Sequence, residues 1–312
     1  MKNKMLFIIL LSLISIITFA QEDTTAVEKV KDKPVRSPFE SGYLIDAQTT
    51  VVPNPNTLEF VIQHKFGTIA NGHSDLWGIY APANIRIGLN YVVKRNLQIG
   101  AGITKTKMAT DVNAKWTIIE QTRENTIPIA VALYGVMAID GRNISAFADN
   151  VSVASPVGEV NEFAFPDRLS YFSQLIIGRK FTDWLSLQTG VSFSHYNLTH
   201  YQREGMQYDH DKIGVHFNGR IKVSPQGSII FNYDVPLKIK DISEQAEWND
   251  EFPHPKSNLS FGYEISTSTH AFQIYAGNAG NFLPQENMMW NQRSISKDNF
   301  AIGFTITRLW GF

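Results

Sequence analysis

The 312-residue chain contains no cysteine. Disulfide bonds and thiolate ligands are therefore excluded, and a metal site would have to be built from histidine, aspartate and glutamate. The chain also lacks an excess of charge of either sign, since 28 lysine and arginine residues face 29 acidic ones. A net charge of -1 argues against nucleic acid as a partner. Nothing in the sequence calls for a cofactor.

Long apolar runs are also missing, except at the start of the chain. Two lysines precede the apolar stretch 5–19, and the small residue Ala20 follows it just before Gln21. This pattern is typical of a cleaved secretory signal, so we assign residues 1–20 to a signal peptide. No later stretch reaches the roughly 20 apolar residues of a membrane helix. A mean hydropathy of -0.15 still permits a membrane β-barrel, because only every second strand residue faces lipid.

Apolar residues recur at every second position from Leu58 onward, in runs long enough to cross a bilayer as tilted strands. The alternation is clearest over Leu185–Phe193, and the last run ends on the aromatic carboxyl terminus, Phe312. Both parities of Ile127–Ile139 and Leu169–Ile177 are apolar, so their facing stays unassigned. About twelve strands are predicted, over Leu58–Phe66, Ile85–Tyr91, Leu97–Ile103, Val112–Ile118, Ile127–Ile139, Leu169–Ile177, Leu185–Phe193, Ile213–Val223, Ile229–Val235, Leu259–Ile265, Phe272–Ala276 and Phe300–Phe312.

The links between these runs alternate between short and long. Such alternation is expected when short turns lie in the periplasm and long loops lie outside the cell. The sequence therefore predicts an all-β fold, an antiparallel up-and-down transmembrane β-barrel over residues 57–312, in the cell outer membrane. An even strand number would return Phe312 to the periplasm. The alternatives are a secreted soluble β-sandwich and an intracellular-style barrel with a water-exposed surface, whose strands also alternate. Long links are predicted at Thr68–Ala83, Asp140–Asp167, Leu198–His210, Lys238–Ser257 and Asn278–Asp298.

Residues 21–56 form a separate stretch between the signal and the barrel. Its first half is rich in charge, and Pro53 and Pro55 interrupt its end. We expect a periplasmic extension that could dock a periplasmic partner. Its second half, residues 41–52, could be ordered against the barrel, and a loose linker is an equally open interpretation.

Several short motifs near the start of the barrel resemble a family of outer-membrane β-barrel proteins that is common in Bacteroidota. The resemblance implies the fold and the location, but no activity, cofactor or catalytic residue. Where the family favours arginine this chain has Lys65, which keeps the charge without a bidentate geometry. The motifs are Gln48–Thr50, Thr57–Phe60, His64–Gly67, Trp77–Tyr80 and Asn84–Leu89.

Charged side chains fall on the predicted lumen face of the strands. A barrel of this size has a narrow interior, so charges on opposite walls could line a polar pore or pair and close it. We predict a narrow channel or binding barrel for a small polar or anionic solute. An accessory barrel that docks a periplasmic or surface partner is the alternative. The candidate lumen-lining residues are Glu59, Lys65, Arg86, Lys115, His216, Arg220, Lys222, Asp234 and Glu264.

Histidine and carboxylate residues gather around one long loop. They could hold a zinc-like ion, but no partner with fixed spacing follows, so they are weak metal candidates. Ser194 and His195 also raise the hypothesis of an outer-membrane lipid hydrolase. Their opposite parity directs Ser194 inward and His195 outward, so we predict that the protein is not an enzyme. The weak metal candidates are His195, His200, Asp209, His210 and Asp211.

The expected partners follow from the barrel itself. Its outer face would contact outer-membrane lipid and lipopolysaccharide, and its last strand, ending in Phe312, would be recognised by the barrel-assembly machinery. Aromatic rings prefer the two membrane interfaces. We therefore predict anchors at the strand ends, at Trp77, Tyr80, Trp184, Tyr196, Tyr201, Trp310 and Phe312.

Overall fold

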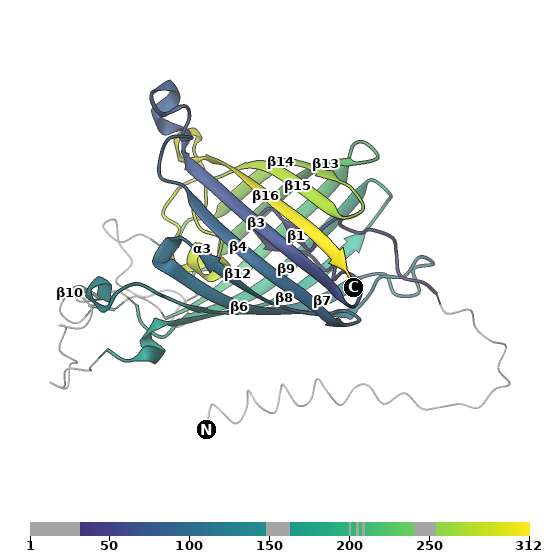
Figure 1. Ribbon diagram of the computed structural model, residues 1–312, viewed down its shortest axis with the longest axis horizontal. Helices are drawn as coiled ribbons and strands as arrows, with labels where there is room; N and C mark the ends of the chain where they lie inside the picture. The colour runs from purple at the N-terminus through teal and green to yellow at the C-terminus, as the bar shows by residue number, and fades with distance from the viewer. Residues whose placement is uncertain (1–31, 148–162, 200, 204–205, 208–209, 240–253) are drawn as a thin grey trace. The chain divides into compact units, whose positions relative to one another are not determined.

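The computed structural model describes residues 32–147, 163–199, 201–203, 206–207, 210–239 and 254–312. Residues 33–312 form one compact unit. Its main feature is a closed barrel of twelve antiparallel strands, each paired with its neighbours in the chain (Figure 1). The last strand pairs with the first, which closes the ring. The predicted fold class is therefore confirmed, and the expected outer-membrane location follows from it.

All twelve predicted runs appear as barrel strands. Their ends differ from the prediction by a few residues, since turn chemistry decides where pairing stops. The barrel strands are β3 (Thr57–Thr68), β4 (Asn84–Lys94), β5 (Leu97–Thr104), β6 (Ala109–Ile119), β7 (Ala130–Ile139), β8 (Leu169–Lys180), β9 (Leu185–Tyr196), β12 (Asp211–Lys222), β13 (Gly227–Pro236), β14 (Asn258–Ser266), β15 (His270–Gly277) and β16 (Ala301–Gly311).

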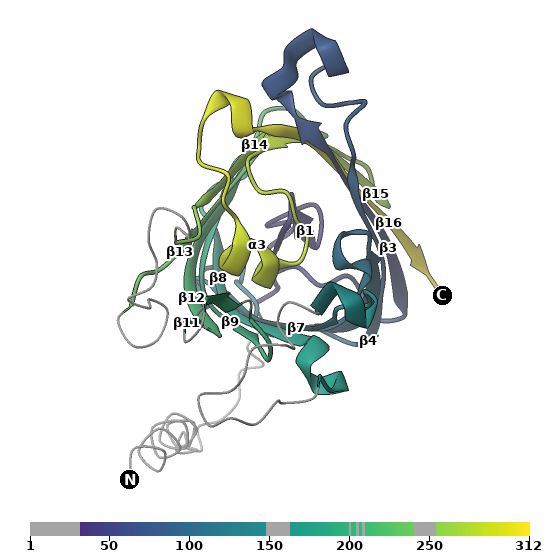
Figure 2. The ribbon, with the colours of Figure 1, turned by 90° about the vertical axis from the view of Figure 1, so that its left-hand side faces the viewer.

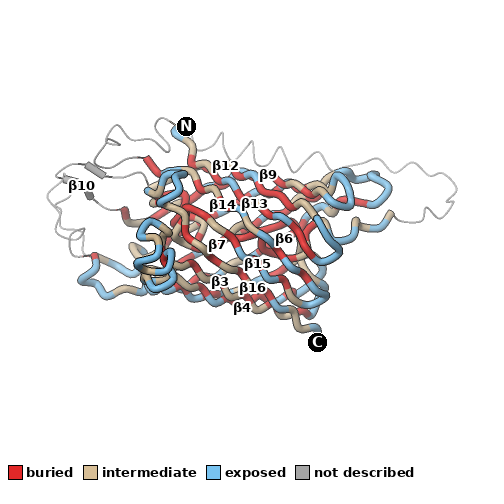
Figure 3. Tube along the Cα trace, turned by 90° about the horizontal axis from the view of Figure 1, so that it is seen from above, coloured by how far each residue is buried: buried red, intermediate tan, exposed pale blue. Residues whose placement is uncertain are grey.

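Burial alternates along the strands, as the period of two requires (Figure 3). In β3 every second residue is buried, beginning with Thr57. Large apolar side chains such as Leu89, Val191 and Ile274 lie on the outer face and are exposed. This outward apolar band is the surface that a lipid bilayer covers. The buried set on the inner face is mostly polar, unlike the core of a soluble protein.

Four of the predicted aromatic anchors are exposed, Trp184 and Phe312 at strand ends and Trp77 and Tyr80 in the loop between β3 and β4. Tyr196 differs, because it is only 7% exposed and its hydroxyl donates a hydrogen bond to Glu286 inside the barrel. The anchor prediction for Tyr196 is therefore wrong. Counting two residues back along β9 places Tyr196 on the inner parity, with Ser194 and Ser192.

Short turns join the strands at one end of the barrel and longer loops join most of them at the other, and we call these the short-turn end and the long-loop end. The loops carry short helices, and none among the described residues is long and apolar enough to span a bilayer. A small sheet pairs β10 (Tyr201–Arg203) with β11 (Met206–Gln207). The helices are η1 (Ile69–Asp75), η2 (Thr106–Met108), η3 (Ile144–Phe147), η4 (Phe165–Arg168), α3 (Pro284–Trp290) and η5 (Lys297–Asn299).

Two segments enter the ring of strands (Figure 2). The first, which we call the inner segment, comprises residues 33–56 and contains the hairpin β1 (Tyr43–Leu44) and β2 (Ala47–Gln48). The second is helix α3, whose residues 285–289 are buried. The Asn278–Asp298 link was predicted to project outside. That prediction is wrong for α3, because its methionines find an apolar surface inside the barrel.

Candidate functional site

The inner segment enters and leaves the barrel at the same end. Near its start, Pro34 forms an isolated bridge with Thr122, in the turn between β6 and β7. Near its finish, the Asn56 amide donates to the carbonyl of Val92, close to the turn between β4 and β5. Both turns belong to the short-turn end. The hairpin therefore reaches into the lumen and returns without passing through the barrel.

The structure places the predicted lumen charges on the inner face. Eight of the nine are less than 9% exposed, and the ninth, Lys222, is half-buried at the short-turn end of β12. Whether they line a path for a solute is a separate question, which depends on their partners. The eight buried residues are Glu59, Lys65, Arg86, Lys115, His216, Arg220, Asp234 and Glu264.

The buried acids of the strands have their partners on the strands. Asp111, which the prediction omitted, accepts two bonds from the Arg86 guanidinium, of 2.9 and 2.6 Å. Glu59 accepts from the side-chain amides of Asn90 and Gln98, at 3.0 and 2.8 Å. Asp234 accepts from two asparagine side chains and lies 2.7 Å from His216, and Glu264 accepts from Gln273. These hydrogen-bond donors all lie in the wall of the barrel, although Oε1 of Glu264 is buried without a hydrogen-bond partner.

Three buried cations of the strands instead have acceptors on the inner segment. Arg220 donates to the Glu40 carboxylate at 2.6 Å and to the Ser37 carbonyl at 3.0 Å. Lys115 donates to the Gly42 carbonyl and to the Gln48 side chain, at 3.1 and 3.0 Å. The third is Lys65, which forms an ion pair with Asp46. The inner segment thus supplies two carboxylates and several carbonyl groups to the positive groups of the wall.

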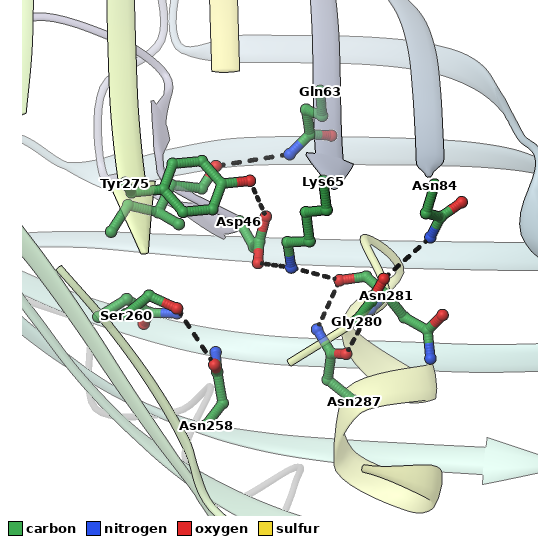
Figure 4. Close-up of polar contacts among 12 residues, drawn as sticks. Asp46, Gln63, Lys65, Asn84, Asn258, Ser260, Tyr275, Gly280, Asn281 and Asn287 are labelled. Carbon is green, nitrogen blue, oxygen red and sulfur yellow. Dashed lines mark hydrogen bonds and ion pairs between the residues drawn. The ribbon is translucent and has the colours of Figure 1, made fainter. Parts of the chain in front are cut away.

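Lys65 is the point where both inserted segments meet the wall (Figure 4). Its ammonium donates to Asp46 of the hairpin and, at 2.8 Å, to the Asn281 carbonyl just before α3. It also lies 5.0 Å from the centre of the Phe282 ring. All of these partners come from inserted segments. Burial raises the pKa of the Asp46 carboxyl, while the Lys65 ammonium acts in the opposite direction.

The hairpin turns at Ile45, whose φ is +60°. This conformation is costly for a β-branched residue and persists only where its surroundings hold it. The Ile45 amide donates to Gln273 at 2.7 Å, and the Ile45 carbonyl accepts from Thr305 and Gln63, at 3.2 and 3.4 Å. The Ile45 side chain is completely buried. The wall therefore fixes both the main chain and the side chain of the turn.

Helix α3 is held mainly by packing on one side of the lumen. Met288 is 2% exposed and belongs to an apolar cluster with Tyr134, Phe172 and Ile176. At the mouth, Glu286 accepts bonds from Lys107, at 2.8 Å, and from Tyr196, at 2.7 Å. Helix α3 thus fills the long-loop half of the lumen with apolar volume and one charged pair.

A small cavity remains between the hairpin and α3. Asp46, Gln174, His216 and Met288 contribute to its lining, and its volume is about 20 Å³, which is room for about one water molecule. The imidazole of His216 also lies 2.7 Å from the Ser192 hydroxyl. Ser192, His216 and Asp234 are thus hydrogen-bonded in the order of a hydrolase triad. A space this small cannot hold an acyl substrate beside them.

The histidine cluster at the long-loop end has a different arrangement from the one a metal requires. His195 bonds to Asp211 at 2.6 Å and to Asn197 at 3.0 Å, while His210 lies 2.6 Å from the Tyr196 carbonyl. The described residues contain no group of three or more potential ligands that could hold a metal. The other two metal candidates, His200 and Asp209, lie outside the described residues.

The hydrolase hypothesis for Ser194 and His195 is also left without support. Ser194 is fully buried on the inner face, whereas His195 is about one-third exposed on the outer face. Their side chains therefore lie on opposite sides of the barrel wall, in agreement with their parity. A serine and a histidine so separated cannot form a nucleophile and base.

Besides Asp111, the sequence prediction missed the site residues Glu40 and Asp46. They precede the first barrel strand, and the alternation that identifies lumen residues does not extend to them. Two signals were available: the apolar Tyr43–Ile45 stretch and the excess of basic over acidic candidates on β12. Together they could have suggested that a folded, acidic segment enters the lumen.

Closed strand pairing, an apolar outer band and a polar filled lumen define an outer-membrane β-barrel protein. Residues 39–310 match the membrane-bound β-barrel domain family (DUF5777), and the chain belongs to this family. The match begins at Phe39, so it includes most of the inner segment. The resemblance seen in the sequence is confirmed as regards an outer-membrane barrel family, while its distribution among Bacteroidota stays a prediction.

Solved outer-membrane barrels are similar at low identity. An outer-membrane channel from Pseudomonas putida F1 is 11% identical, with 83% of this chain and 97% of that chain covered and a TM-score of 0.48. The NanC porin is 8% identical, with 82% and 99% covered and a TM-score of 0.46. The KdgM porin is 8% identical, with 82% and 99% covered and a TM-score of 0.40. No curated protein sequence matches the chain.

Proposed function

We propose that this protein is a gated outer-membrane barrel for a small anionic solute, and that the structure is its closed state. The observation that carries the proposal is the division of partners in the lumen. The buried wall acids accept hydrogen bonds from wall residues, whereas Lys65, Lys115 and Arg220 have acceptors on the inner segment. Displacing that segment would remove the carboxylate partners of Lys65 and Arg220 and the two hydrogen-bond acceptors of Lys115, while Lys65 would keep the Asn281 carbonyl. An entering anion could then replace the lost acceptors. The proposal includes no covalent catalysis.

The path of the inner segment supports displacement as a physical step. Both of its ends lie at the short-turn end, so the hairpin can withdraw without threading the chain through the barrel. Withdrawal breaks hydrogen bonds and ion pairs that water or a solute can replace, and it also separates Leu44 and Ile45 from the apolar cluster that they form with Ile230 of the wall. It leaves the barrel strands and their ladders intact. In outer-membrane barrels the short turns lie in the periplasm, so the short-turn end of this barrel, from which the hairpin withdraws, faces the periplasm.

The experiment compares conductance with and without the hairpin in place. The full chain, in planar bilayers, should give little current in this closed state. Replacing Ser41 and Thr307 by cysteine would join the hairpin to β16, since their hydroxyl oxygens are 3.2 Å apart and the chain has no other cysteine. Deleting residues 41–52 should open an anion-selective current. Absence of current in the deletion variant, with the barrel folded, would contradict the proposal.

The cysteine pair is also the control for movement in the full chain. Rare openings seen in the unaltered protein should disappear when the pair is oxidised and return on reduction. Selectivity adds a second check, because the conducting form should favour anions. The preference should weaken in Arg220→Met and Lys222→Met, which remove positive charge near the short-turn end. Openings that survive oxidation would show that the hairpin is not the gate.

A second candidate function is an accessory barrel that docks a periplasmic partner. The observation that favours it is the clip formed by residues 33–36 at the short-turn end. The Lys33 carbonyl accepts a hydrogen bond from the Arg123 amide, and the Lys180 ammonium donates one to the Arg36 carbonyl at 3.1 Å. These bonds hold residues 33–36 at the short-turn end. Deleting residues 21–32 should then remove co-purifying partners and leave conductance unchanged.

A further inference from the structure

The tip of the hairpin forms hydrogen bonds with side chains of three neighbouring strands, β15, β16 and β3. Strand register places these side chains in two rows. Gln273 is opposite Thr305, and Thr305 is opposite Gln63. Gln273 accepts a hydrogen bond from the Ile45 amide, and Thr305 and Gln63 donate hydrogen bonds to the Ile45 carbonyl. The first row thus recognises main-chain amide groups with one acceptor and two donors.

The second row lies two residues further along the same strands. Tyr275 is opposite Gly303, and Gly303 is opposite Lys65. A side chain at Gly303 would come within 2.8 Å of the Tyr275 ring, so glycine is needed there for the ring to lie flat. The Asp46 carboxylate is held between the two ends of this row. Lys65 donates to one of its oxygens, and the Tyr275 hydroxyl donates to the other at 3.4 Å.

We propose that these two rows are a binding site for a solute that carries an acyl-amide group next to a carboxylate, such as an N-acyl acidic amino acid or a short acidic peptide. Ile45 and Asp46 are its internal stand-in. The proposal rests on the proposed function, because the solute can occupy the site only when the hairpin tip has left it. With the hairpin tip in place, Gln63, Lys65, Gln273, Tyr275 and Thr305 are all less than 4% exposed, and all five lie on paired barrel strands.

Chemical rescue of the full chain tests the carboxylate part of the site without any current measurement. Asp46→Ala removes the stand-in and leaves Lys65 and Tyr275 in place. Formate or acetate should raise the thermal midpoint of this variant and have little effect on the unaltered protein. Acetamide has the shape of acetate without its charge and should not act. Equal rescue by acetamide would overturn the carboxylate site.

Variants of the wall show whether rescue depends on the two proposed donors. Adding Lys65→Met to Asp46→Ala should abolish rescue by acetate, and adding Tyr275→Phe should weaken it. Tyr263→Phe is the matched control, because this tyrosine lies on the outer face of β14 and is 41% exposed. Rescue that survives Lys65→Met would place the anion elsewhere and contradict the proposal.

Competition in a chain with its hairpin intact tests the amide part. A single cysteine at Ala47 reports exposure of the hairpin by its rate of maleimide labelling. N-acetylaspartate should raise this rate at a concentration about tenfold lower than N-acetylasparagine amide, because bonds to a charged group are the stronger ones. Succinate has the carboxylates without the amide and should act only at higher concentration. Equal potency of all three compounds would overturn the assignment of solute class.

The two proposals can fail separately. Rescue by acetate without conductance in the hairpin deletion would retain the carboxylate site and reject the channel. Conductance without rescue or competition would retain the channel and reject this solute class. If Asp46→Ala does not fold, the labelling competition still decides, because it leaves Asp46 and the wall unaltered.

Discussion

Apart from the pair of Lys107 with Glu286 of α3, the charged pairs of the lumen described above fall into two sets, and the comparison between these sets carries the functional argument. In one set both partners are on barrel strands, as with Arg86 and Asp111. In the other set one partner is on a strand and one is on the inner segment, as with Lys65 and Asp46 or Arg220 and Glu40. The second set always has the cation on the wall.

This difference distinguishes the pairs that hold the barrel wall together from the pairs on which the proposed function depends. A salt-bridge network that only fills the lumen would have no reason to place the carboxylates of the second set on one segment that precedes the barrel. Under the proposed function, pairs within the wall stay formed when the inner segment leaves. The wall is then a permanent frame, and the proposal makes the acidic partners of its cations exchangeable. If the two sets differ in this way, they will respond differently to substitution.

The largest expected effect comes from breaking a pair within the wall. Asp111→Ala leaves the Arg86 guanidinium buried without its carboxylate, and such losses cost about 3–5 kcal/mol. The barrel itself should be destabilised, because both residues belong to strands. Urea unfolding followed by the gel-mobility shift of folded barrels measures this change.

Asp46→Ala is the matched substitution in the second set. It should lower the unfolding midpoint of the barrel much less than Asp111→Ala, since release of the hairpin returns Lys65 to a wetter lumen. Equal losses in the two variants would mean that the inner segment is an integral part of the fold. The comparison between the two sets would then fail.

Much of the barrel could be predicted from the sequence because its signals are local. Alternation along each strand reports which face meets lipid, and the alternating link lengths report the topology. The ends of strands were less predictable, as at Ile127, where the chain is still in a turn that bonds to Thr122. Turn hydrogen bonds, which no periodic pattern reveals, decided that boundary.

The candidate site was only half predictable. The wall charges follow from parity, which placed Lys65, Lys115 and Arg220 on the inner face. Their partners did not follow, because Glu40 and Asp46 are 180 and 19 residues from the cations they meet. Nor did the burial of α3, whose short Pro284–Trp290 sequence has no clear strand or amphipathic period. Contacts of this kind depend on the shape of the closed lumen.

An intermediate effect is expected from Glu40→Gln, which keeps the size of the side chain and removes its charge. The change weakens the contact with Arg220 and the longer contact with Lys222. Hydrogen bonds to charged groups contribute about 1.5–3 kcal/mol, so exposure of the inner segment should increase about tenfold or more. Maleimide labelling of a cysteine at Ala47 measures it. An unchanged labelling rate, or a lower unfolding midpoint of the barrel, would count against an exchangeable set.

The smallest effect is expected at a charged pair outside both sets. Arg95 and Glu120 join two short turns at 2.8 Å, but the Arg95 side chain is 69% exposed. Exposed pairs contribute about 0–1 kcal/mol, because water screens the charges and two long side chains must be ordered. Arg95→Ala should therefore leave both the unfolding midpoint and the Ala47 labelling rate almost unchanged. A large change in either would show that the short turns, and not the lumen pairs, control the stability and the opening of this barrel.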